Sequence, residues 1–409
     1  MPDPAVPLRD ARNQPEAALL LACSRTRITP EIADRIRMLV QKEVDWLALI
    51  RLAMRHNVMP LLYRSLQQVC PDSVPANIFA PLRANYEMQA ALARRRAEEV
   101  VRILPLFEDR GIPIVPYKGP ALAQRLFGDA SLREFSDLDF LILERDVSTA
   151  KELIRSLGYE YTLYKDTDDL AEYIRTNPDC ELQFKRPDGA ILELHWRFSR
   201  RSAGVRRDPE RFWQRTEIIQ LAGAQVPSLS LEVYFLILSM HAAKHKWGQL
   251  KLICDLAEIL AHPGLDWTYV VREATDLGLR RMLSVSALLA EDVLDVEIPA
   301  ELAQGLRIDS IARGVAGQIS RGLFAERDKA WNAPADFFFQ FKIRERLRDR
   351  TGVLCQSAPE EAKLFCRRLP DKLTPNERDR QFLPMPESFS SLYYLVKPVR
   401  WTWEKVSSR

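Results

Sequence analysis

The sequence predicts an α+β protein in which a small core with a mixed sheet lies between helical regions. Apolar residues recur at helical spacing over residues 17–108 and again over 230–324. Residues 111–196 instead contain short apolar runs separated by turn residues, which is the pattern of strands. With 409 residues, 47% of them hydrophobic, the chain is long enough for two or three domains.

Individual elements follow from local patterns. The segment from Asp45 to Met54 shows the apolar spacing of the first helical region. In the core, the turn residues Pro187-Asp188-Gly189 predict a hairpin. An acidic first turn predicts a helix over 146–157. The expected strands are 112–117, 138–143, 159–164, 181–185 and 190–196.

We therefore expect four regions along the chain. They are a helical region over 1–108, the strand-containing core over 109–228, a second helical region over 229–335, and a tail of helical and extended segments over 336–409. Because prolines punctuate the tail, we expect it to wrap over the rest of the protein.

Charge, apolar runs and cysteine spacing indicate which partners and which cellular location to expect. The formal charge of +3, from 59 basic and 56 acidic residues, neither demands nor excludes nucleic acid. No basic surface interleaved with aromatic residues is evident, so we do not expect a nucleic-acid partner. No apolar run reaches the roughly 20 residues that span a membrane, and the N-terminus lacks a signal-peptide stretch. Six scattered cysteines form no C-x-x-C pair. We expect a cytoplasmic protein with buried or free thiols and no membrane partner.

A lysine and a glycine follow the first expected strand. Lys118-Gly119 occupies the turn into a helix that begins near Pro120. Backbone N–H groups at a helix N-terminus, together with a lysine, can bind phosphate oxygens. Strand-to-helix turns with glycine are also common without a function, so the pair becomes informative only together with the acids that follow it.

Three carboxylates stand on two expected strands. Because strand side chains alternate, Asp137 and Asp139 emerge on one face while Leu138 turns to the other. Glu193 repeats this arrangement in the last expected strand. Three acids can hold a pair of Mg²⁺ ions about 4 Å apart, with substrate phosphates completing the shell. The pattern predicts phosphoryl or nucleotidyl transfer.

Four segments occur in a characteristic order. They are Tyr117-Lys-Gly-Pro-Ala-Leu122, Arg133 to Asp139, Glu193-Leu-His-Trp196, and His241-Ala-Ala-Lys-His-Lys-Trp247 with Leu250 and Asp255. In this order they resemble the polymerase-β-like nucleotidyltransferase superfamily. More narrowly, they resemble an uncharacterised bacterial nucleotidyltransferase family, some members of which are associated with lasso-peptide biosynthesis. The resemblance covers most of the chain and implies a nucleotidyltransferase core flanked by helical domains.

The resemblance implies roles for single residues. Asp137 and Asp139 would be metal ligands, and Glu193 would be either a third ligand or the base for the incoming hydroxyl. Lys118 and Gly119 would hold the triphosphate. The superfamily commonly has Gly-Gly or Gly-Ser in this turn, so the lysine could alter phosphate geometry or donor choice.

Two residues near the acids have alternative roles. Arg133, which we count with Ser136 among the nucleotide-binding candidates, could contact the triphosphate or pair with one of the carboxylates. His195 shares a strand face with Glu193, so it could orient that carboxylate, contact substrate or pack under a helix.

Two histidines stand four residues apart on a predicted helix. This is metal-ligand spacing, but zinc is not expected because the sequence around His241 and His245 offers no third soft ligand. Lys244 and His245, with Asp255, could instead line the nucleotide or acceptor cleft, with Trp247 packing between helices. A structural role for this cluster is equally compatible with the pattern.

The sequence thus predicts a metal-dependent transferase. It would move a nucleoside monophosphate from an NTP, with ATP as the expected donor, to a hydroxyl of a peptide, a protein or a small molecule, and would release pyrophosphate. Mg²⁺ is the expected cofactor, with Mn²⁺ as an alternative. A kinase-like phosphotransferase acting on a peptide natural product and a catalytically silent nucleotide-binding module are the alternative functions.

Overall fold

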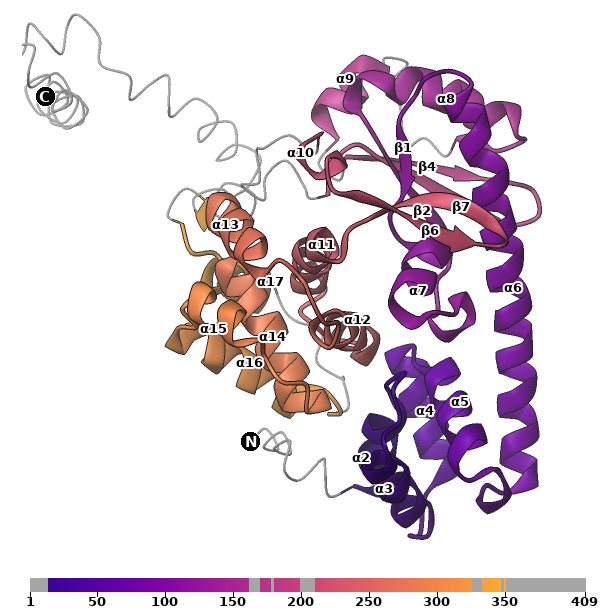
Figure 1. Cartoon of the computed structure of the whole chain (residues 1–409), viewed down its shortest axis with the longest axis vertical. Helices are drawn as coiled ribbons and strands as arrows, with labels where there is room; N and C mark the ends of the chain where they lie inside the picture. Colours follow the sequence, from indigo (N-terminus) through magenta and orange to yellow (C-terminus); the bar gives the residue numbers. More distant parts are fainter. Residues whose placement is uncertain are drawn as a thin grey trace, which may run out of the picture. The chain divides into compact units, whose positions relative to one another are not determined.

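The computed structural model describes most of the chain (Figure 1). Contacts divide the chain into two compact units, Met1–Asp349 and Arg350–Arg409, and the helices and strands named here lie in the first. Most of the predicted tail and the last part of the strand predicted over 159–164 lie outside the described residues. The described residues are 14–161, 170–177, 180–198, 210–325, 333–346 and 349–350.

The region predicted to be helical over 17–108 is helical. Its elements are α2 (Pro15–Cys23), α3 (Pro30–Val40), α4 (Trp46–His56), α5 (Met59–Val69), the short 3₁₀ helix η1 (Pro71–Ser73) and α6 (Ala76–Glu108). Thr29 and Asp45 cap α3 and α4, because their side-chain oxygens accept hydrogen bonds from the backbone N–H groups of Ile32 and Ala48. Helix α6 is 33 residues long and leads directly to the first strand.

Five strands form one mixed sheet. They are β1 (Ile114–Pro116), β2 (Asp137–Ile142), β3 (Glu160–Tyr161), β4 (Glu181–Lys185) and β5 (Ile191–His195). Their order is β1-β2-β5-β4-β3, in which β2 and β5 are parallel and the other neighbours are antiparallel. All five lie within or overlap the predicted strands, and β4 and β5 form the predicted hairpin. The α+β prediction is therefore confirmed.

Helices connect the strands of the sheet. The connecting elements are α7 (Gly119–Phe127), η2 (Ala130–Leu132), η3 (Glu144–Asp146), α8 (Val147–Ser156), α9 (Leu170–Thr176) and α10 (Glu210–Trp213). Leu138, Phe140 and Leu192 belong to a hydrophobic core that also contains Val100 of α6 and Ile154 of α8. The alternate residues of β2 and β5 therefore face away from this core.

A second hairpin follows the sheet and was not predicted. It consists of β6 (Thr216–Leu221) and β7 (Ala224–Leu229), paired antiparallel. Most of β6 is exposed or half-buried, so its apolar residues do not alternate as those of a half-buried strand do. Pro227 in β7 also weakens the strand pattern, because proline cannot donate to a neighbouring strand. Because of these two features, the sequence pattern did not predict the hairpin.

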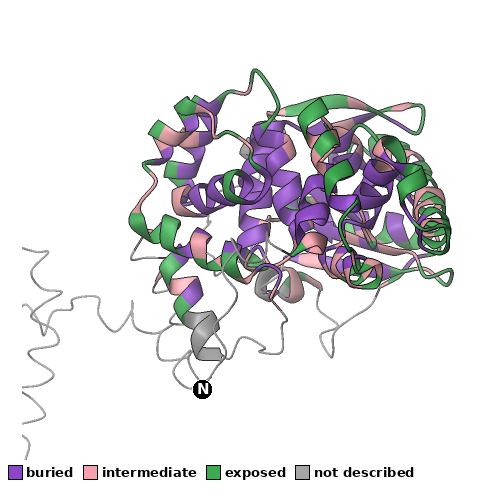
Figure 2. Ribbon diagram, turned by 90° about the horizontal axis from the view of Figure 1, so that it is seen from below, coloured by how far each residue is buried: buried purple, intermediate pink, exposed green. Residues whose placement is uncertain are grey.

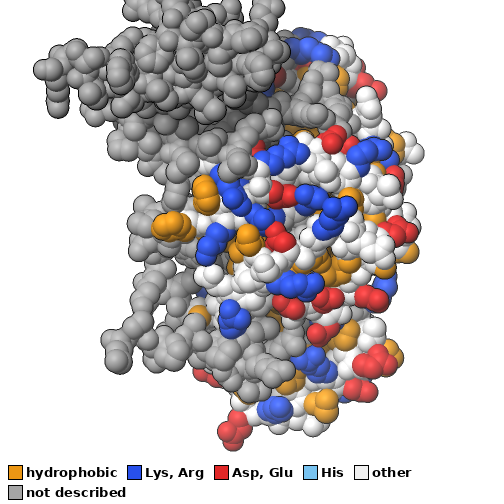
Figure 3. Space-filling view, turned by 90° about the vertical axis from the view of Figure 1, so that its left-hand side faces the viewer, with side chains coloured by type: hydrophobic (Ala, Val, Ile, Leu, Met, Phe, Trp, Pro, Cys, Tyr) orange, Lys and Arg blue, Asp and Glu red, His pale blue; other side chains and the backbone are white. Residues whose placement is uncertain are grey.

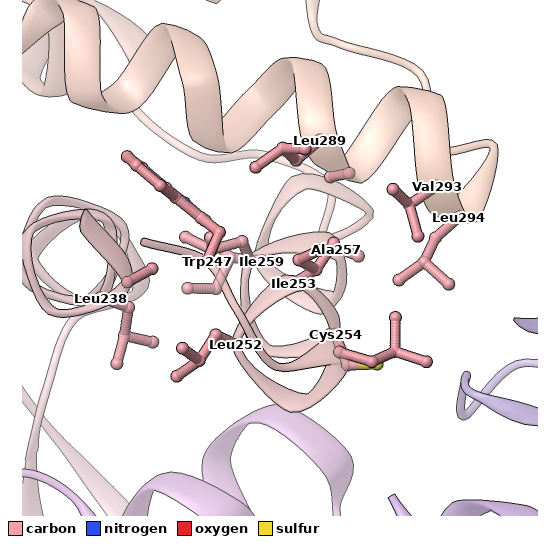
Figure 4. Close-up of a cluster of buried hydrophobic side chains, with 14 of the residues drawn as sticks. Leu238, Trp247, Leu252, Ile253, Cys254, Ala257, Ile259, Leu289, Val293 and Leu294 are labelled. Atoms are coloured by element: carbon pink, nitrogen blue, oxygen red, sulfur yellow. The ribbon is translucent and has the colours of Figure 1, made fainter. Parts of the chain in front are cut away.

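The region predicted to be helical over 230–324 is also helical. Its elements, with the helix that follows them, are α11 (Leu231–Lys244), α12 (Leu250–Leu260), α13 (Trp267–Leu277), α14 (Arg280–Leu294), α15 (Ala300–Leu306), α16 (Ser310–Gly322) and α17 (Ala333–Ile343). Figure 4 shows Leu238 of α11, Ile253 of α12 and Leu289 of α14 in one cluster of buried hydrophobic side chains. Trp247 is buried among these helices, as predicted, and its indole N–H donates to Ser286 Oγ at 3.1 Å.

Burial follows this arrangement. In Figure 2 the buried residues gather where helices meet one another and the sheet, and the exposed residues lie on their outer sides. Cys23, Cys70 and Cys254 are buried and form no disulfide, as their spacing predicts. Among the described residues, no helix is both long enough and apolar enough to cross a membrane.

Candidate active site

The polar face of the sheet brings carboxylates from two parallel strands together. In the β2–β5 register, Asp139 is paired with Glu193, and Asp137 is paired with Ile191. Because alternate residues share a face, Asp137, Asp139 and Glu193 lie on the side opposite the hydrophobic core. The structure therefore places the three predicted acids on one face, as strand alternation requires.

A histidine joins two of these acids. One ligand atom from each of Asp139, Glu193 and His195 can be chosen so that all three lie within 4.8 Å of one another. Asp137 is not part of this group, although its carboxyl is close enough to Asp139 and Glu193 to be affected by their charges. Burial and then these two carboxylates raise the pKa of Asp137.

Asp139 lies at the centre of the polar contacts. Its side chain is 3% exposed, and its Oδ1 accepts from Lys118 Nζ at 3.1 Å and lies 3.1 Å from His195 Nε2. Burial alone would favour the protonated carboxyl, but Lys118 and His195 hold the pKa of Asp139 well below its usual range. Asp139 is therefore ionised at neutral pH.

Lys118 is directed toward the acids. Burial disfavours its ammonium, but the neighbouring Tyr117 and Asp139 more than offset this effect, so the pKa of Lys118 is raised. Its Nζ also lies 4.9 Å from the centre of the Tyr117 ring. The structure places the ammonium of Lys118 beside the carboxylate of Asp139, and the predicted contact of Lys118 with phosphate stays a prediction.

Gly119 allows the turn before α7 to approach β2 closely. Its φ is +57°, and a Cβ atom built on it would lie 3.1 Å from the backbone oxygen of Asp137. A larger residue would meet both a strained backbone and this contact. The N-terminus of α7 is consequently held against the strand that carries the two aspartates.

Glu193 and His195 are fixed by their neighbours on β4. Oε1 of Glu193 accepts from Gln183 Nε2 at 2.8 Å, and its Oε2 lies 3.2 Å from His195 Nε2. The other ring nitrogen of His195, Nδ1, lies 3.5 Å from Glu181 Oε2. Burial lowers the pKa of His195, but Asp139 and Glu193 raise it more, so the net shift is upward. Of the roles considered for His195, contact with the carboxylates is the one that the geometry shows.

Arg133 forms a buried ion pair with α12. Its Nε lies 2.9 Å from Asp255 Oδ1 and its second guanidinium nitrogen lies 3.0 Å from Oδ2, with the two side chains 5% and 1% exposed. The two alternatives for Arg133 were the triphosphate and one of the site carboxylates, whereas the observed partner is Asp255. The predicted contact of Arg133 with nucleotide stays a prediction. Asp255, for which lining a cleft and a structural role were the alternatives, is buried in this pair.

The end of α11 lies near the acids. His241 is half-buried, and its ring centre is 4.7 Å from that of His245, which with Lys244 is exposed. Burial and then Lys118 and His245 lower the pKa of His241 well below its usual value, while Asp139 opposes them. Lys118 and Asp139 therefore act electrostatically on His241, in the last turn of α11.

Ser136 is exposed at the start of β2, and its hydroxyl hydrogen bond lowers the pKa of Asp137 against the larger upward effects. The structure therefore places Ser136 next to the first aspartate, where it was predicted to help bind nucleotide.

Sequence reasoning missed Lys251. Its Nζ donates to the backbone oxygen of Glu134 at 3.2 Å, and burial followed by the charge of Arg133 lowers its pKa to about 8. Asp137 also acts on Lys251 electrostatically, so this ammonium lies near the acids from the side of α12. The only sequence signal was its place four residues before Asp255, which a single sequence does not distinguish from a surface lysine.

Comparison with known proteins identifies the family of the chain. A family model described as an uncharacterised nucleotidyltransferase matches residues 42–295, which is more than half of the chain and includes Asp137, Asp139, Glu193 and His195. No curated protein and no solved structure matches the chain. The chain therefore belongs to this family of uncharacterised nucleotidyltransferases.

Proposed function

We propose that the protein is a polymerase-β-like nucleotidyltransferase that moves a nucleoside monophosphate from an NTP to a hydroxyl acceptor. The observation that carries the proposal is the pairing of Asp139 with Glu193 across parallel strands, next to Asp137 on the same face. The family of the chain supports transfer from a nucleotide. The helical regions 1–108 and 229–335, and a tail over 336–409, would flank the catalytic core 109–228.

The donor atoms at the site fit a divalent cation. Carboxylate oxygens from Asp137, Asp139 and Glu193 are hard ligands of the kind that Mg²⁺ and Mn²⁺ prefer. The carboxylate of Asp139 is ionised despite burial, as a ligand must be. When bound, such a cation neutralises the charge of the triphosphate and orients it for displacement. Judged by these three carboxylates alone, the fitting pair is Mg²⁺ with ATP, and Mn²⁺ is the alternative cation.

The chain's own residues would position the two substrates. The N-terminus of α7 at Gly119 offers backbone N–H groups, and Lys118 offers an ammonium, next to the acids. Ser136 at the start of β2, and Lys244 and His245 at the end of α11, would contact the nucleotide as well. Arg133, which is held by Asp255 and interacts electrostatically with Asp139 and Asp137, would add positive charge near the triphosphate.

The reaction is an in-line displacement. The acceptor oxygen forms a bond to the α-phosphorus while the bond from that phosphorus to its bridging oxygen breaks, and pyrophosphate leaves with the bonding electrons. The acceptor proton passes to a base, for which Glu193 is the candidate on the site face. Positioning and charge neutralisation supply most of the rate enhancement in reactions of this type.

The acceptor that we propose is a peptide or protein hydroxyl, with a small molecule as the alternative. The motif resemblance to a family with members associated with lasso-peptide biosynthesis supports the peptide, and the buried thiols support action in the cytoplasm. Figure 3 shows a face on which basic and acidic side chains are mixed, which gives no reason to propose a nucleic-acid acceptor from that face.

The test is a donor screen with a mass readout. The protein is incubated with Mg²⁺ or Mn²⁺ and each of the four NTPs, with and without a pool of host-lysate or peptide acceptors. We expect pyrophosphate release and an acceptor mass increase of one nucleoside monophosphate. In Asp139→Asn we expect both signals to fall at least about a hundredfold, the size of effect seen when one electrostatic stabiliser is removed.

A matched control distinguishes the effect of losing a site carboxylate from the effect of losing any negative charge on the same sheet. Glu160→Gln removes an exposed acid from β3 of the same sheet and should leave the rate within about twofold of the unchanged protein, as expected for a surface substitution. A mass increase of one phosphate would identify the kinase-like alternative. Nucleotide binding without turnover of any acceptor would contradict nucleotidyl transfer and indicate a binding module.

A further inference from the structure

The inference concerns His195, whose imidazole lies between the acids of the proposed site. Nε2 of His195 is 3.1 Å from Asp139 Oδ1 and 3.2 Å from Glu193 Oε2. In an octahedral ion with bonds of about 2.1 Å, neighbouring ligand atoms lie about 3.0 Å apart. The two observed distances therefore suit three atoms that share one cation.

The second ring nitrogen has the partner that a metal-binding histidine needs. Glu181 stands directly opposite His195 in the β4–β5 register, and its Oε2 lies 3.5 Å from Nδ1. Histidines that bind metals usually direct the other nitrogen at a carboxylate or a carbonyl, which fixes the tautomer and leaves the metal-facing nitrogen unprotonated. Glu181 can supply that carboxylate here.

Packing fixes the plane of the ring. His195 is buried, with its side chain 7% exposed, and it meets the ring of Tyr117 edge to face with the centres 5.3 Å apart. A histidine with only a packing role would not need both nitrogens directed at carboxylates. Here three carboxylates from β2, β4 and β5 surround the imidazole.

We propose that His195 is itself a ligand of the divalent cation through Nε2, that Glu181 orients it through Nδ1, and that the site consequently prefers Mn²⁺ to Mg²⁺. This inference rests on the proposed function, because it assigns a further ligand to the same site. An imidazole nitrogen suits the later divalent ions, whereas Mg²⁺ is bound almost entirely through oxygen. A site with two carboxylates and one imidazole therefore discriminates between these ions.

The first measurement is the affinity for Mn²⁺ alone, from the electron paramagnetic resonance signal of the free ion during titration of the full-length protein. Mg²⁺ is then added as a competitor. In His195→Asn we expect the affinity for Mn²⁺ to fall at least about tenfold, while that for Mg²⁺ changes less. The preference for Mn²⁺ over Mg²⁺ should fall accordingly.

The second measurement detects the nitrogen directly. Pulsed electron paramagnetic resonance of bound Mn²⁺ should show coupling to an imidazole ¹⁴N nucleus in the unchanged protein and in Glu181→Gln, but not in His195→Asn. Because Glu181 would only orient the ring, Glu181→Gln should weaken Mn²⁺ binding about tenfold while it keeps the coupling. Thermal unfolding of each variant checks that the fold is retained.

Two histidine controls identify the source of the coupling. His241→Asn changes a half-buried imidazole on which Asp139 acts electrostatically, and His262→Asn changes an exposed one that contacts the backbone of Pro263. Both variants should keep the ¹⁴N coupling. Loss of the coupling in His241→Asn with retention in His195→Asn would overturn the assignment.

The outcomes separate this inference from the proposed function. Nucleotidyl transfer by a protein whose bound Mn²⁺ shows no ¹⁴N coupling would overturn the role of His195 and leave the function standing. Coupling through His195 in a protein that transfers no nucleotide would support the ligand and contradict the function. An unchanged preference between Mn²⁺ and Mg²⁺ in His195→Asn would also overturn the inference.

Discussion

Asp139 keeps its charge in a buried position because two other elements supply its partners. Lys118 comes from the turn between β1 and α7, and His195 comes from the end of β5, each 3.1 Å from the same carboxylate oxygen. Without them, burial would raise the pKa of the carboxyl rather than lower it. The ionisation of the Asp139 carboxyl therefore depends on the folding of segments that are distant from it in sequence.

Lys251 leads to a prediction about pH. Its pKa is lowered to about 8, first by burial and then by Arg133, so the ammonium is present below pH 8 and is lost as the pH rises through that value. If Lys251 assists triphosphate binding, the KM for NTP should rise as the pH increases through about 8, because a charge-assisted contact is lost. Measuring KM across this range checks the prediction.

Two variants test whether Lys251 is the group whose titration changes KM. Lys251→Arg keeps its charge at every pH of the assay and should remove the rise in KM. Lys251→Met should raise KM at least about tenfold at neutral pH, since a hydrogen bond to a charged group contributes about 1.5–3 kcal/mol. A KM profile in Lys251→Arg that still rises through pH 8 would assign the titration to another group.

Among the elements, strands with clear alternation could be predicted and irregular ones could not. β4 was predicted with its observed bounds, Glu181–Lys185, because a turn follows it and its apolar residues alternate. The hairpin of β6 and β7 was missed because its strands are largely exposed and contain Pro227. Strand alternation also predicted the shared face of Asp137 and Asp139, which requires no knowledge of the fold.

Contacts between distant elements were beyond prediction. The pairing of Asp139 with Glu193 depends on β2 and β5 being parallel neighbours, which alternation within either strand does not specify. The partner of Arg133 is 122 residues away on α12 and cannot be identified from local pattern. Lys251 and Glu181 gain their positions near the site only through the same tertiary arrangement.

The buried pair of Arg133 and Asp255 joins the segment before β2 to α12. Removing one partner leaves a buried charge without compensation, which typically costs about 3–5 kcal/mol. We expect Arg133→Met to lower the free energy of unfolding by this amount, and the double variant Arg133→Met/Asp255→Leu to recover part of it. Urea unfolding with an unchanged slope measures both values.

A more exposed pair provides the comparison. Arg125 and Glu217 lie 2.7 Å apart with side chains 20% and 43% exposed, so Arg125→Ala should cost no more than about 1 kcal/mol. If Arg133→Met costs as little as Arg125→Ala, the pair with Asp255 does not stabilise this junction. Failure of the double variant to recover stability would show that Arg133 acts through other contacts.

For the described chain as a whole, the helices before and after the sheet share one hydrophobic core. Leu20 and Leu62 from the first helical region belong to the same buried cluster as Ile253 and Leu289 from the second. Hydrogen bonds reinforce this union: Leu250 N donates to His56 Nδ1 at 3.1 Å, and Cys254 Sγ donates to the backbone oxygen of Ser24 at 3.3 Å. The two regions are separate in sequence, but their apolar residues are buried in one hydrophobic core.

A shared core predicts that the two helical regions unfold together. Glu258 of α12 accepts from the backbone N–H and the hydroxyl of Thr26, at 3.0 and 2.7 Å, so it ties α12 to the segment after α2. Removing both bonds in Glu258→Ala should lower stability by about 1–3 kcal/mol, and the loss should be equal for α2 and α12 if they form one cooperative unit. Hydrogen exchange in increasing denaturant, read separately for peptides from α2 and α12, measures the two losses.

A control variant changes an exposed acid between α14 and α15. Glu297→Ala should change the stability of neither α2 nor α12 by more than about 0.5 kcal/mol. If exchange in α2 becomes faster in Glu258→Ala while α12 stays protected, the N-terminal helices open as an independent unit, and their share in the common core does not make the two regions cooperative.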